Sequence, residues 1–262
     1  MTAPPSNPTA RVLIATPVKN ASRHLGTYFT NLARLTYPAG LISLGFLEGD
    51  SDDDTFDQLR GRSDALAGQY RRCGVWQRHT GFRLPPGAPR WAPTLQLFRR
   101  KAIAKARNHL LSRALDDEDW VMWLDVDVIA TPPDLIEQLL ATGRDILHPH
   151  CVKSPGGPSF DLNAWRDGGQ THMDAMRGQG DLVRLDSVGG TVLMIRADIH
   201  RDGLIFPPYL YGSGHRLARR PGPWTTTGQV GEVETEGLAL MAADMGHQCW
   251  GMPHLEVVHA PE

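Results

Sequence analysis

The sequence predicts an α/β fold with a Rossmann-like, mostly parallel sheet flanked by helices. Three features lead to this prediction: short apolar runs that stop at polar turns, stretches of helical periodicity between them, and a regular first half followed by a loop-rich second half. Strands covered by helices on both faces read as continuous apolar runs, and their alternation with helices indicates a parallel sheet. At 262 residues, the chain is long for one domain and short for two.

The first half alternates strand and helix. The apolar run at residues 12–14 reads as a buried strand, and apolar side chains recur at helical spacing over 22–35, with Ser22 as the N-cap. We further expect strands at 41–48, 74–79, 120–128 and 144–150, and helices at 55–70, 94–115 and 131–143. The last of these helices has a Thr131 cap and Pro132 at its first position.

The second half is richer in loops. Residues 80–93 and 151–181 are rich in Gly and Pro, and 207–231 are also loop-like. We expect strands on both sides of Gly189-Gly190, a helix at 234–246 closed by Gly246, and a last strand at 255–262. The prediction is therefore a disordered tail at 1–10 and a single domain at 11–262.

Composition argues against several classes of protein. A formal net charge of -2 gives no indication of a nucleic-acid partner. The three cysteines are far apart and form no CxxC pair, which favours reduced thiols in a cytosolic protein. No window reaches about 18 consecutive apolar residues, so no transmembrane segment is expected. The sequence has no P-loop, GxGxxG, HExxH or GxSxG motif, which lowers the odds of an NTPase, a dehydrogenase, a zinc protease or a serine hydrolase.

Two carboxylates stand directly after an apolar run in "WVMWLDVDV". On a strand, Asp125 and Asp127 point to the same side and Val126 faces the core. Two like charges this close raise each other's pKa, and a divalent cation such as Mn²⁺ or Mg²⁺ removes the conflict. The alternative is that Asp127 only accepts hydrogen bonds from loop amides.

Two enzyme classes use such a DxD pattern. Haloacid-dehalogenase phosphatases place it after the first strand, and here it follows several elements without a downstream GDxxxD motif. Nucleotide-sugar glycosyltransferases of the GT-A type place it about a hundred residues in, after a nucleotide-binding half. The layout of this sequence fits the second class, and a metal-dependent phosphatase or nucleotide-sugar hydrolase remains the alternative.

Six ordered blocks carry a more specific resemblance. They are "RVLIATPVKNASRHLGTYF", "LTYPAGLISLGFLEGDSDDDT", "RRKAIAKARNHLLSRAL", "WVMWLDVDV", "VGGTVLMIRADIHRDGLIFPP", and "VETEGLALMAADMG" followed by "VVHA". Together they resemble the Anp1/Mnn9/Van1 family of fungal mannosyltransferases over residues 11–259. The resemblance implies a GT-A fold, GDP-mannose or another nucleotide-sugar as donor, Mn²⁺, and retaining transfer. Residues 11–130 would then form the donor-binding half and 131–262 the acceptor half.

The resemblance also implies donor contacts. The end of the first strand would meet the nucleotide through Thr16, Pro17, Lys19 and Asn20. Arg23 follows at the donor-side arginine position, where a guanidinium suits a diphosphate; its alternative is a solvated residue of the first helical turn. Asp50 ends the second strand and could accept from ribose or base, while Arg107 in "AKARN" would reach the donor. A surface basic helix is the alternative for Arg107 and its neighbours Arg99, Arg100 and Lys101.

The metal site would be completed from the last strand. In the family this position, His259, joins the DxD, and imidazole suits Mn²⁺ better than Mg²⁺. We expect Asp127 and His259 as direct ligands. Asp125 is either a third ligand, a ligand through water, or a ribose contact.

Catalytic candidates follow in the second half. Glu236, in "VETEG", would orient or deprotonate the acceptor hydroxyl, and Asp186 would contact the sugar. Helix capping is the alternative for the glutamates. Gly189-Gly190 would permit a close backbone approach to donor or acceptor, or form an ordinary tight turn. The loops at 80–93 and 207–231 would shape the acceptor site.

The expected partners are the donor and a glycan or lipid-linked glycan acceptor, without nucleic acid. The sequence shows no N-terminal anchor of the fungal type, which points to a soluble bacterial-type relative in the cytoplasm, free or peripheral at the membrane. Family members also work in complexes. An oligomer or a complex with other transferases is therefore expected, and a non-catalytic subunit is an alternative role.

Overall fold

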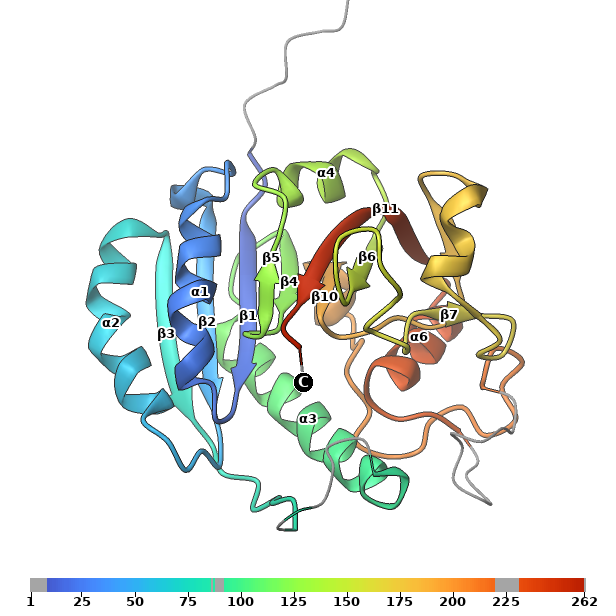
Figure 1. The fold of residues 1–262 in the computed structure, drawn as a ribbon, viewed down its shortest axis with the longest axis horizontal. Coiled ribbons are helices and arrows are strands. Elements are labelled where there is room, and N and C mark those ends of the chain that lie inside the picture. Colours follow the sequence, from blue (N-terminus) through green and yellow to red (C-terminus); the bar gives the residue numbers. More distant parts are fainter. Residues whose placement is uncertain (1–8, 86, 88–91, 220–230, 262) are drawn as a thin grey trace, which may run out of the picture.

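The structure is a computed structural model and describes residues 9–85, 87, 92–219 and 231–261. Most of the expected tail, and parts of the loops expected at 80–93 and 207–231, lie outside the described residues. Figure 1 shows helices on both sides of one large sheet. This arrangement confirms the predicted α/β class.

The described residues form a nine-stranded sheet in the order β3-β2-β1-β4-β10-β6-β11-β5, with β9 pairing with β11. Its strands are β1 Val12–Val18, β2 Ile42–Glu48, β3 Arg72–Gln77, β4 Trp120–Leu124, β5 Val128–Ala130, β6 Ile146–Val152, β9 Val183–Leu185, β10 Val192–Arg196 and β11 Cys249–His259. A separate hairpin, β7 Trp165–Arg166 with β8 Thr171–His172, lies in the expected insertion. The sheet is largely parallel, as predicted.

Antiparallel strands gather in the second half of the sheet. Strands β1, β2, β3 and β4 run parallel, whereas β10 is antiparallel to both β4 and β6. The strands expected around Gly189-Gly190 are β9 and β10, but they pair with β11 and with β4 and β6 rather than with each other. The prediction of both strands is confirmed, and their partners come from tertiary packing.

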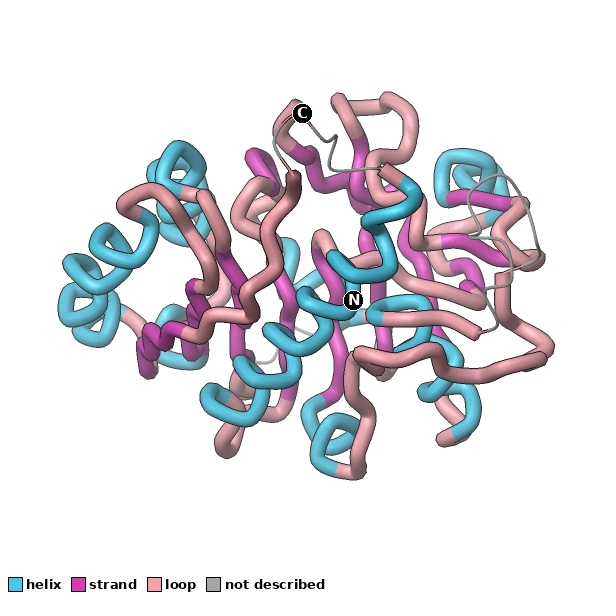
Figure 2. Tube along the Cα trace, turned by 90° about the horizontal axis from the view of Figure 1, so that it is seen from below, coloured by secondary structure: helices cyan, strands magenta, loops and turns pink. Residues whose placement is uncertain are grey.

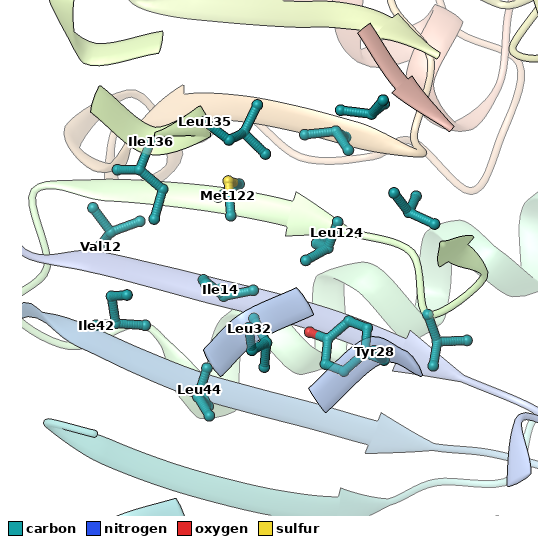
Figure 3. Close-up of a cluster of buried hydrophobic side chains, with 14 of the residues drawn as sticks. Val12, Ile14, Tyr28, Leu32, Ile42, Leu44, Met122, Leu124, Leu135 and Ile136 are labelled. Carbon is teal, nitrogen blue, oxygen red and sulfur yellow. The ribbon is translucent and has the colours of Figure 1, made fainter. Parts of the chain in front are cut away.

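Alternating side chains of the strands supply two cores. Val12 and Ile14 of β1 face one core, and Leu13 and Ala15 face the other. The first core is closed by α1 Ser22–Ala33, α2 Thr55–Gln69, α4 Leu135–Ala141 and the short η1 Ala39–Leu41; part of it is shown in Figure 3. The second is closed by α3 Pro93–Ala114, α5 Ala197–Arg201, α6 Glu234–Asp244 and η2 Met173–Gln179.

Two predicted helix caps are wrong. The N-cap of α1 is Ala21, and the Asp53 carboxylate accepts the Ser22 N–H at 3.2 Å from another loop. Helix α4 begins at Leu135 instead of at Pro132. The preceding segment is held from outside, because the Thr36 N–H donates to the Pro133 carbonyl at 2.9 Å. At α1 a tertiary hydrogen bond thus replaces the local cap, and before α4 a tertiary hydrogen bond holds Pro133 outside the helix.

Other boundaries also move. The predicted strand at 74–79 is β3 and begins two residues earlier, at Arg72. The last strand begins at Cys249, before the predicted 255. Gly246 follows the end of α6 with φ of 88°, which confirms it as the residue that closes this helix. Strand β4 ends at Leu124, so the two aspartates of the DxD lie in a turn and not on the strand.

Candidate functional site

A pocket of about 550 Å³ lies at the carboxyl ends of β1, β2 and β4. Ligands of open α/β sheets bind at this edge. Its walls come from the segment after β1, the loop at 78–84 after β3, the first half of α3 and the DxD turn. Figure 2 looks onto this edge from below, with the long helix α3 crossing it.

Cationic side chains surround the pocket. Of the predicted donor contacts, Lys19, Arg23 and Arg107 line it together with Pro17, Asn20, Asp50 and Asp125. Three more arginines also line it: Arg78, Arg83 and Arg99. Arg78 and Arg83 follow β3 in a loop whose sequence has no regular pattern. For Arg99, the sequence also allowed a place on the surface of a basic helix. Only the course of that loop and the angle of α3 bring these three residues to the site.

The end of β1 is tied to neighbouring loops. Thr16 is fully buried and shares a hydrogen bond of 2.6 Å with the Tyr28 hydroxyl, so it supports the strand end and does not line the pocket. Lys19 donates to the Phe82 carbonyl at 2.7 Å. Asn20 has φ of 50°, and its side chain accepts the Asp52 N–H at 2.7 Å. The predicted nucleotide-binding segment is thus held in one shape by two loops.

Asp50 organises the loop after β3. Its carboxylate accepts the Thr80 N–H at 2.8 Å, the Thr80 hydroxyl at 2.7 Å and the Gly81 N–H at 3.0 Å. Burial alone would raise the pKa of Asp50, but these hydrogen bonds and the charge of Lys19 lower it below its usual range. Asp50 lines the pocket, and in this structure its acceptor capacity is directed to the loop.

The DxD turn places its two carboxylates in the pocket. Val126 is buried in the first core, as predicted. The Asp125 N–H donates to the Thr191 carbonyl at 2.8 Å, and the Asp125 carboxylate accepts from Arg107 at 3.1 Å. Burial and then the neighbouring charge of Asp127 raise the pKa of Asp125 to about 7, against the lowering effect of Arg107. Because a divalent cation favours the ionised carboxylate, this site is suited to one.

Asp127 faces His259, which β11 brings to the same edge. The distance from Asp127 Oδ1 to His259 Nε2 is 3.1 Å. His259 Nδ1 lies 2.6 Å from the Ala260 carbonyl, and the ring stacks on Phe160 at 3.5 Å between centroids. With Nδ1–H donating to the Ala260 carbonyl, the hydrogen bond to Asp127 requires a proton on Nε2 as well. A metal ion would take the place of the Nε2 proton, and the Nδ1–H donor would keep the tautomer that a metal ligand needs. Burial lowers the pKa of His259, but the hydrogen bond and charge of Asp127 outweigh it, and the pKa is raised.

The donor chemistry of this pair fits Mn²⁺, which accepts both carboxylate and imidazole ligands. Across the part of the chain that the structure describes, no three His, Cys, Asp or Glu side chains are grouped closely enough to hold a metal ion. Asp127 and His259 are therefore two candidate ligands. Asp125 lies nearby with its carboxylate directed to Arg107.

Arg107 is a buried junction between the two halves. Its guanidinium lies over the rings of Trp123 and Phe206, 5.4 and 5.2 Å from their centroids, and the two rings pack edge to face at 4.9 Å. Nη2 donates to Asp125 and, at 3.0 Å, to the Gly190 carbonyl, while Nε lies 3.3 Å from Glu234 Oε1. The side chain is 3% exposed, so Arg107 is not part of a surface basic helix. It reaches the pocket and fixes Asp125.

Glu236 is buried away from the pocket. Its carboxylate pairs with Arg100 and Arg219 and accepts from Trp165 Nε1 at 2.9 Å. Burial would raise its pKa, but the two guanidiniums lower it to about 2. Glu236 is not among the residues that line the pocket. In this structure it joins α3, α6 and the segment that contains Arg219.

Asp186 also lies apart from the DxD turn. It lines a second pocket of about 180 Å³ with residues from α6 and the start of β11. Its carboxylate accepts the Asp167 N–H at 2.9 Å. The structure therefore brings together the predicted donor and metal residues, but not the two predicted catalytic residues.

Solved structures with the same fold are glycosyltransferases. A mannosyltransferase from Pyrobaculum calidifontis, in complex with GDP-Man and Mn²⁺, matches with a TM-score of 0.60 and 16% identity, over 97% of this chain and 58% of that chain. GalNAc-T7, with UDP, GalNAc and Mn²⁺, matches with a TM-score of 0.55 and 13% identity, over 95% and 44%. These likenesses confirm the predicted GT-A fold.

Curated relatives are yeast proteins. The mannan polymerase complex subunit mnn9 of Schizosaccharomyces pombe is 32% identical over 292 residues, covering 96% of this chain and 80% of the relative. The mannan polymerase II complex anp1 subunit of the same yeast is 28% identical over 298 residues, covering 98% and 65%. The chain thus spans about two thirds of the length of the latter. Among the described residues, no helix is both long and apolar enough to cross a membrane.

The family assignment does not depend on these pairs alone. The Anp1 family model matches residues 1–179 and 168–210, a span that includes the donor-side strands, the DxD turn and Gly189-Gly190. With a pocket and fold of the expected kind, this match confirms the resemblance noted in the six blocks. The chain belongs to the Anp1 family.

Proposed function

We propose that this chain is a glycosyltransferase that moves a sugar from a nucleoside diphosphate to a hydroxyl acceptor. The observation that carries the proposal is the Asp127–His259 pair, 3.1 Å apart, whose Asp127 lines a pocket together with six Lys and Arg side chains. A diphosphate needs both a cation and positively charged donors. Mannose from GDP-mannose is the specific donor that membership of the family favours.

Asp127 and His259 would hold the metal, with Mn²⁺ favoured over Mg²⁺ by the imidazole ligand. When bound, the ion would neutralise charge on the leaving nucleoside diphosphate. The ring of His259 is fixed by its stack on Phe160 and by the Ala260 carbonyl, so the ligand would be oriented before the metal arrives.

The surrounding residues bind and orient the donor. Arg23, Arg78 and Arg99 line the pocket and provide positive charge for the diphosphate. Lys19 and Asp50 hold the loop at 79–82 against the strand ends, which gives the nucleoside half a defined wall.

Retaining transfer agrees with the placement of Glu236. A retaining reaction has no need for a base on the opposite face of the sugar ring, and the Glu236 carboxylate is occupied by Arg100, Arg219 and Trp165. Under the proposal, Glu236 shapes the acceptor half by joining α3 to α6. The acceptor is a glycan or lipid-linked glycan hydroxyl.

A second candidate role is a non-catalytic subunit of a transferase complex. The names of the relatives favour it, because they are subunits of mannan polymerase complexes. A complex would also supply a partner under the main proposal. Turnover by the isolated chain separates the two roles.

Calorimetric titration tests the proposal. The whole chain is titrated with GDP-mannose, UDP-glucose and UDP-GlcNAc, each with and without Mn²⁺, and incubated with mannosyl acceptors for analysis by mass spectrometry. We expect Mn²⁺-dependent binding of GDP-mannose and a glycosylated product. Binding without any turnover supports the subunit role, and donor hydrolysis without transfer supports a hydrolase. Absence of Mn²⁺-dependent binding to all three donors contradicts the proposal.

A further inference from the structure

Gly189 and Gly190 lie between two buried charged side chains. A Cβ on Gly190 would stand 2.5 Å from Arg107 Nη2 and 3.0 Å from its Cζ. A Cβ on Gly189 would stand 1.9 Å from Asp161 Oδ2 and 2.1 Å from its Cγ. Neither residue is among the glycines with positive φ, so conformation alone does not require glycine at either position. The close contacts with Asp161 and Arg107 on two sides of the segment require it.

Asp161 holds one side of this segment. Its Oδ2 accepts the N–H of Gly190 at 3.0 Å, and the N–H and hydroxyl of Thr191 at 3.3 and 3.0 Å. The side chain is 7% exposed, and His148 Nε2 lies 3.6 Å away on its far side. The backbone of the segment is therefore anchored by a buried carboxylate.

The other side of the segment contacts Arg107 and Asp125, which line the pocket. The Gly190 carbonyl accepts from Arg107 Nη2 at 3.0 Å, and the Thr191 carbonyl accepts the Asp125 N–H at 2.8 Å. The same Nη2 donates to the Asp125 carboxylate at 3.1 Å. Two consecutive carbonyls thus set both members of the Arg107–Asp125 pair.

We infer that Gly189 and Gly190 are positioning residues, which place Arg107 and the first aspartate of the DxD turn by letting Asp161 and Arg107 contact opposite sides of one backbone segment. The inference rests on the proposed function, because it assigns these residues to the donor site. It replaces the expectation that the glycines themselves approach donor or acceptor.

A double-variant cycle tests the inference. Dissociation constants for GDP-mannose with Mn²⁺ are measured for the wild type, Gly190→Ala, Gly189→Ala, Arg107→Lys and the double variant Gly190→Ala/Arg107→Lys. Gly61→Ala is the control, because a Cβ at Gly61 on α2 meets no atom within 4 Å. We expect Gly190→Ala and Gly189→Ala to weaken binding about tenfold and the control to stay within about twofold.

The double variant decides how the glycine acts. Lysine lacks Nη2, the atom nearest to the new methyl, and its flexible Nζ, which takes the place of Cζ, can move away, so the substitution relieves the collision. We expect the double variant to bind as Arg107→Lys does and to regain the resistance to urea that Gly190→Ala loses. Three outcomes would overturn the inference. The losses in binding of the two single variants could add up in the double variant, Gly190→Ala could behave like Gly61→Ala, or the double variant could fail to fold. If the wild type binds no nucleotide-sugar, the proposed function fails, and the urea cycle alone decides whether Gly190 positions Arg107.

Discussion

Asp127 and His259 are the residues on which the chemistry of the pocket depends most. They are far apart in sequence and 3.1 Å apart in the structure. Each is largely buried, with 16% and 6% of its side chain exposed. A carboxylate and an imidazole that face each other in this way gain from a shared cation, since both become ligands in their unprotonated forms.

Asp127→Asn is expected to weaken Mn²⁺ binding about tenfold or more, because the amide keeps the size of the side chain but loses its charge. Electron paramagnetic resonance of free Mn²⁺ measures the effect. Asp54→Asn, at an exposed carboxylate before α2, is the control and should leave the affinity unchanged. Equal Mn²⁺ affinity of Asp127→Asn and wild type would exclude Asp127 as a ligand.

Elements of the second half are joined through buried ion pairs. Glu236 at the start of α6 pairs with Arg100 of α3 and with Arg219, which precedes α6 in the chain. Arg219 also lies over the Trp165 ring, 5.2 Å from its centroid. Since the carboxylate is 2% exposed, removing its charge takes the nearest counter-charge from two guanidiniums and leaves Arg100 with Glu234 at 3.7 Å.

Glu236→Gln is therefore expected to lower the free energy of unfolding by about 3 kcal/mol, as for other broken buried ion pairs. Urea unfolding followed by circular dichroism measures it. Asp64→Asn on α2 serves as the comparison, because that side chain is exposed. If Glu236→Gln abolishes turnover with unchanged stability, the residue acts in catalysis, as its sequence position first indicated.

The segment before β4 is held by a second buried carboxylate. Glu118 has no exposed side-chain area and pairs with Arg71 and Arg72 next to β3. Burial would raise its pKa, but hydrogen bonds from Ser43 and Arg72 lower it below its ordinary value. A folded-state pKa below the unfolded one gives stability that is present above the unfolded pKa and is lost as the pH falls through the folded one.

Glu118→Gln should thus cost about 2 kcal/mol of unfolding free energy at pH 7 and progressively less below about pH 4. Urea unfolding at a series of pH values measures the difference between variant and wild type. Asp116→Asn, at a carboxylate whose side chain is 71% exposed, should show little change at any pH. A difference for Glu118→Gln that is independent of pH would contradict the assigned shift.

At the scale of the whole molecule, the net charge is small, but charged side chains gather around the pocket. The chain has a formal net charge of -2, yet the pocket is lined by six Lys and Arg side chains and four Asp side chains. Because the positive charge is local, the phosphates of a ligand should dominate its binding.

GDP with Mn²⁺ is accordingly expected to raise the melting temperature by about 5 °C or more at a hundredfold excess over its dissociation constant. Guanosine, which lacks the phosphates, should raise it much less. Differential scanning fluorimetry measures both. Equal shifts for GDP and guanosine would show that the cationic residues do not bind the diphosphate.

The fold could be predicted from the sequence to the extent that it follows from local periodicity. The alternation of apolar runs and amphipathic segments located β1, α1, β2, α2 and α3 correctly. Direction is not encoded in such runs, so the antiparallel course of β10 could not be predicted from them. The predicted cap of α1 is wrong because a side chain from another loop, Asp53, accepts the hydrogen bond of the Ser22 N–H at the helix end.

The site was predictable where a residue follows a strand directly, as Lys19 and Asp125 do. His259 came from the resemblance to a family, since a single histidine at a strand end has no local signal. Arg78 and Arg83 were not predicted as pocket residues, because the course of the loop after β3 determines their positions. The ion pairs of Glu236 could not be predicted, since Arg100 on α3 and Arg219 before α6 meet it only in the packed fold.

The position of β11 has a consequence for the order of assembly. This strand pairs with β6, β9 and β5, and β5 follows the DxD turn directly. Figure 1 shows it in red, next to β5. Until β11 docks, β5 lacks its partner in the sheet and Asp127 lacks His259. A chain in which β11 has not docked would lack one of the two candidate metal ligands, so a gain of Mn²⁺ affinity during refolding would report the docking of β11.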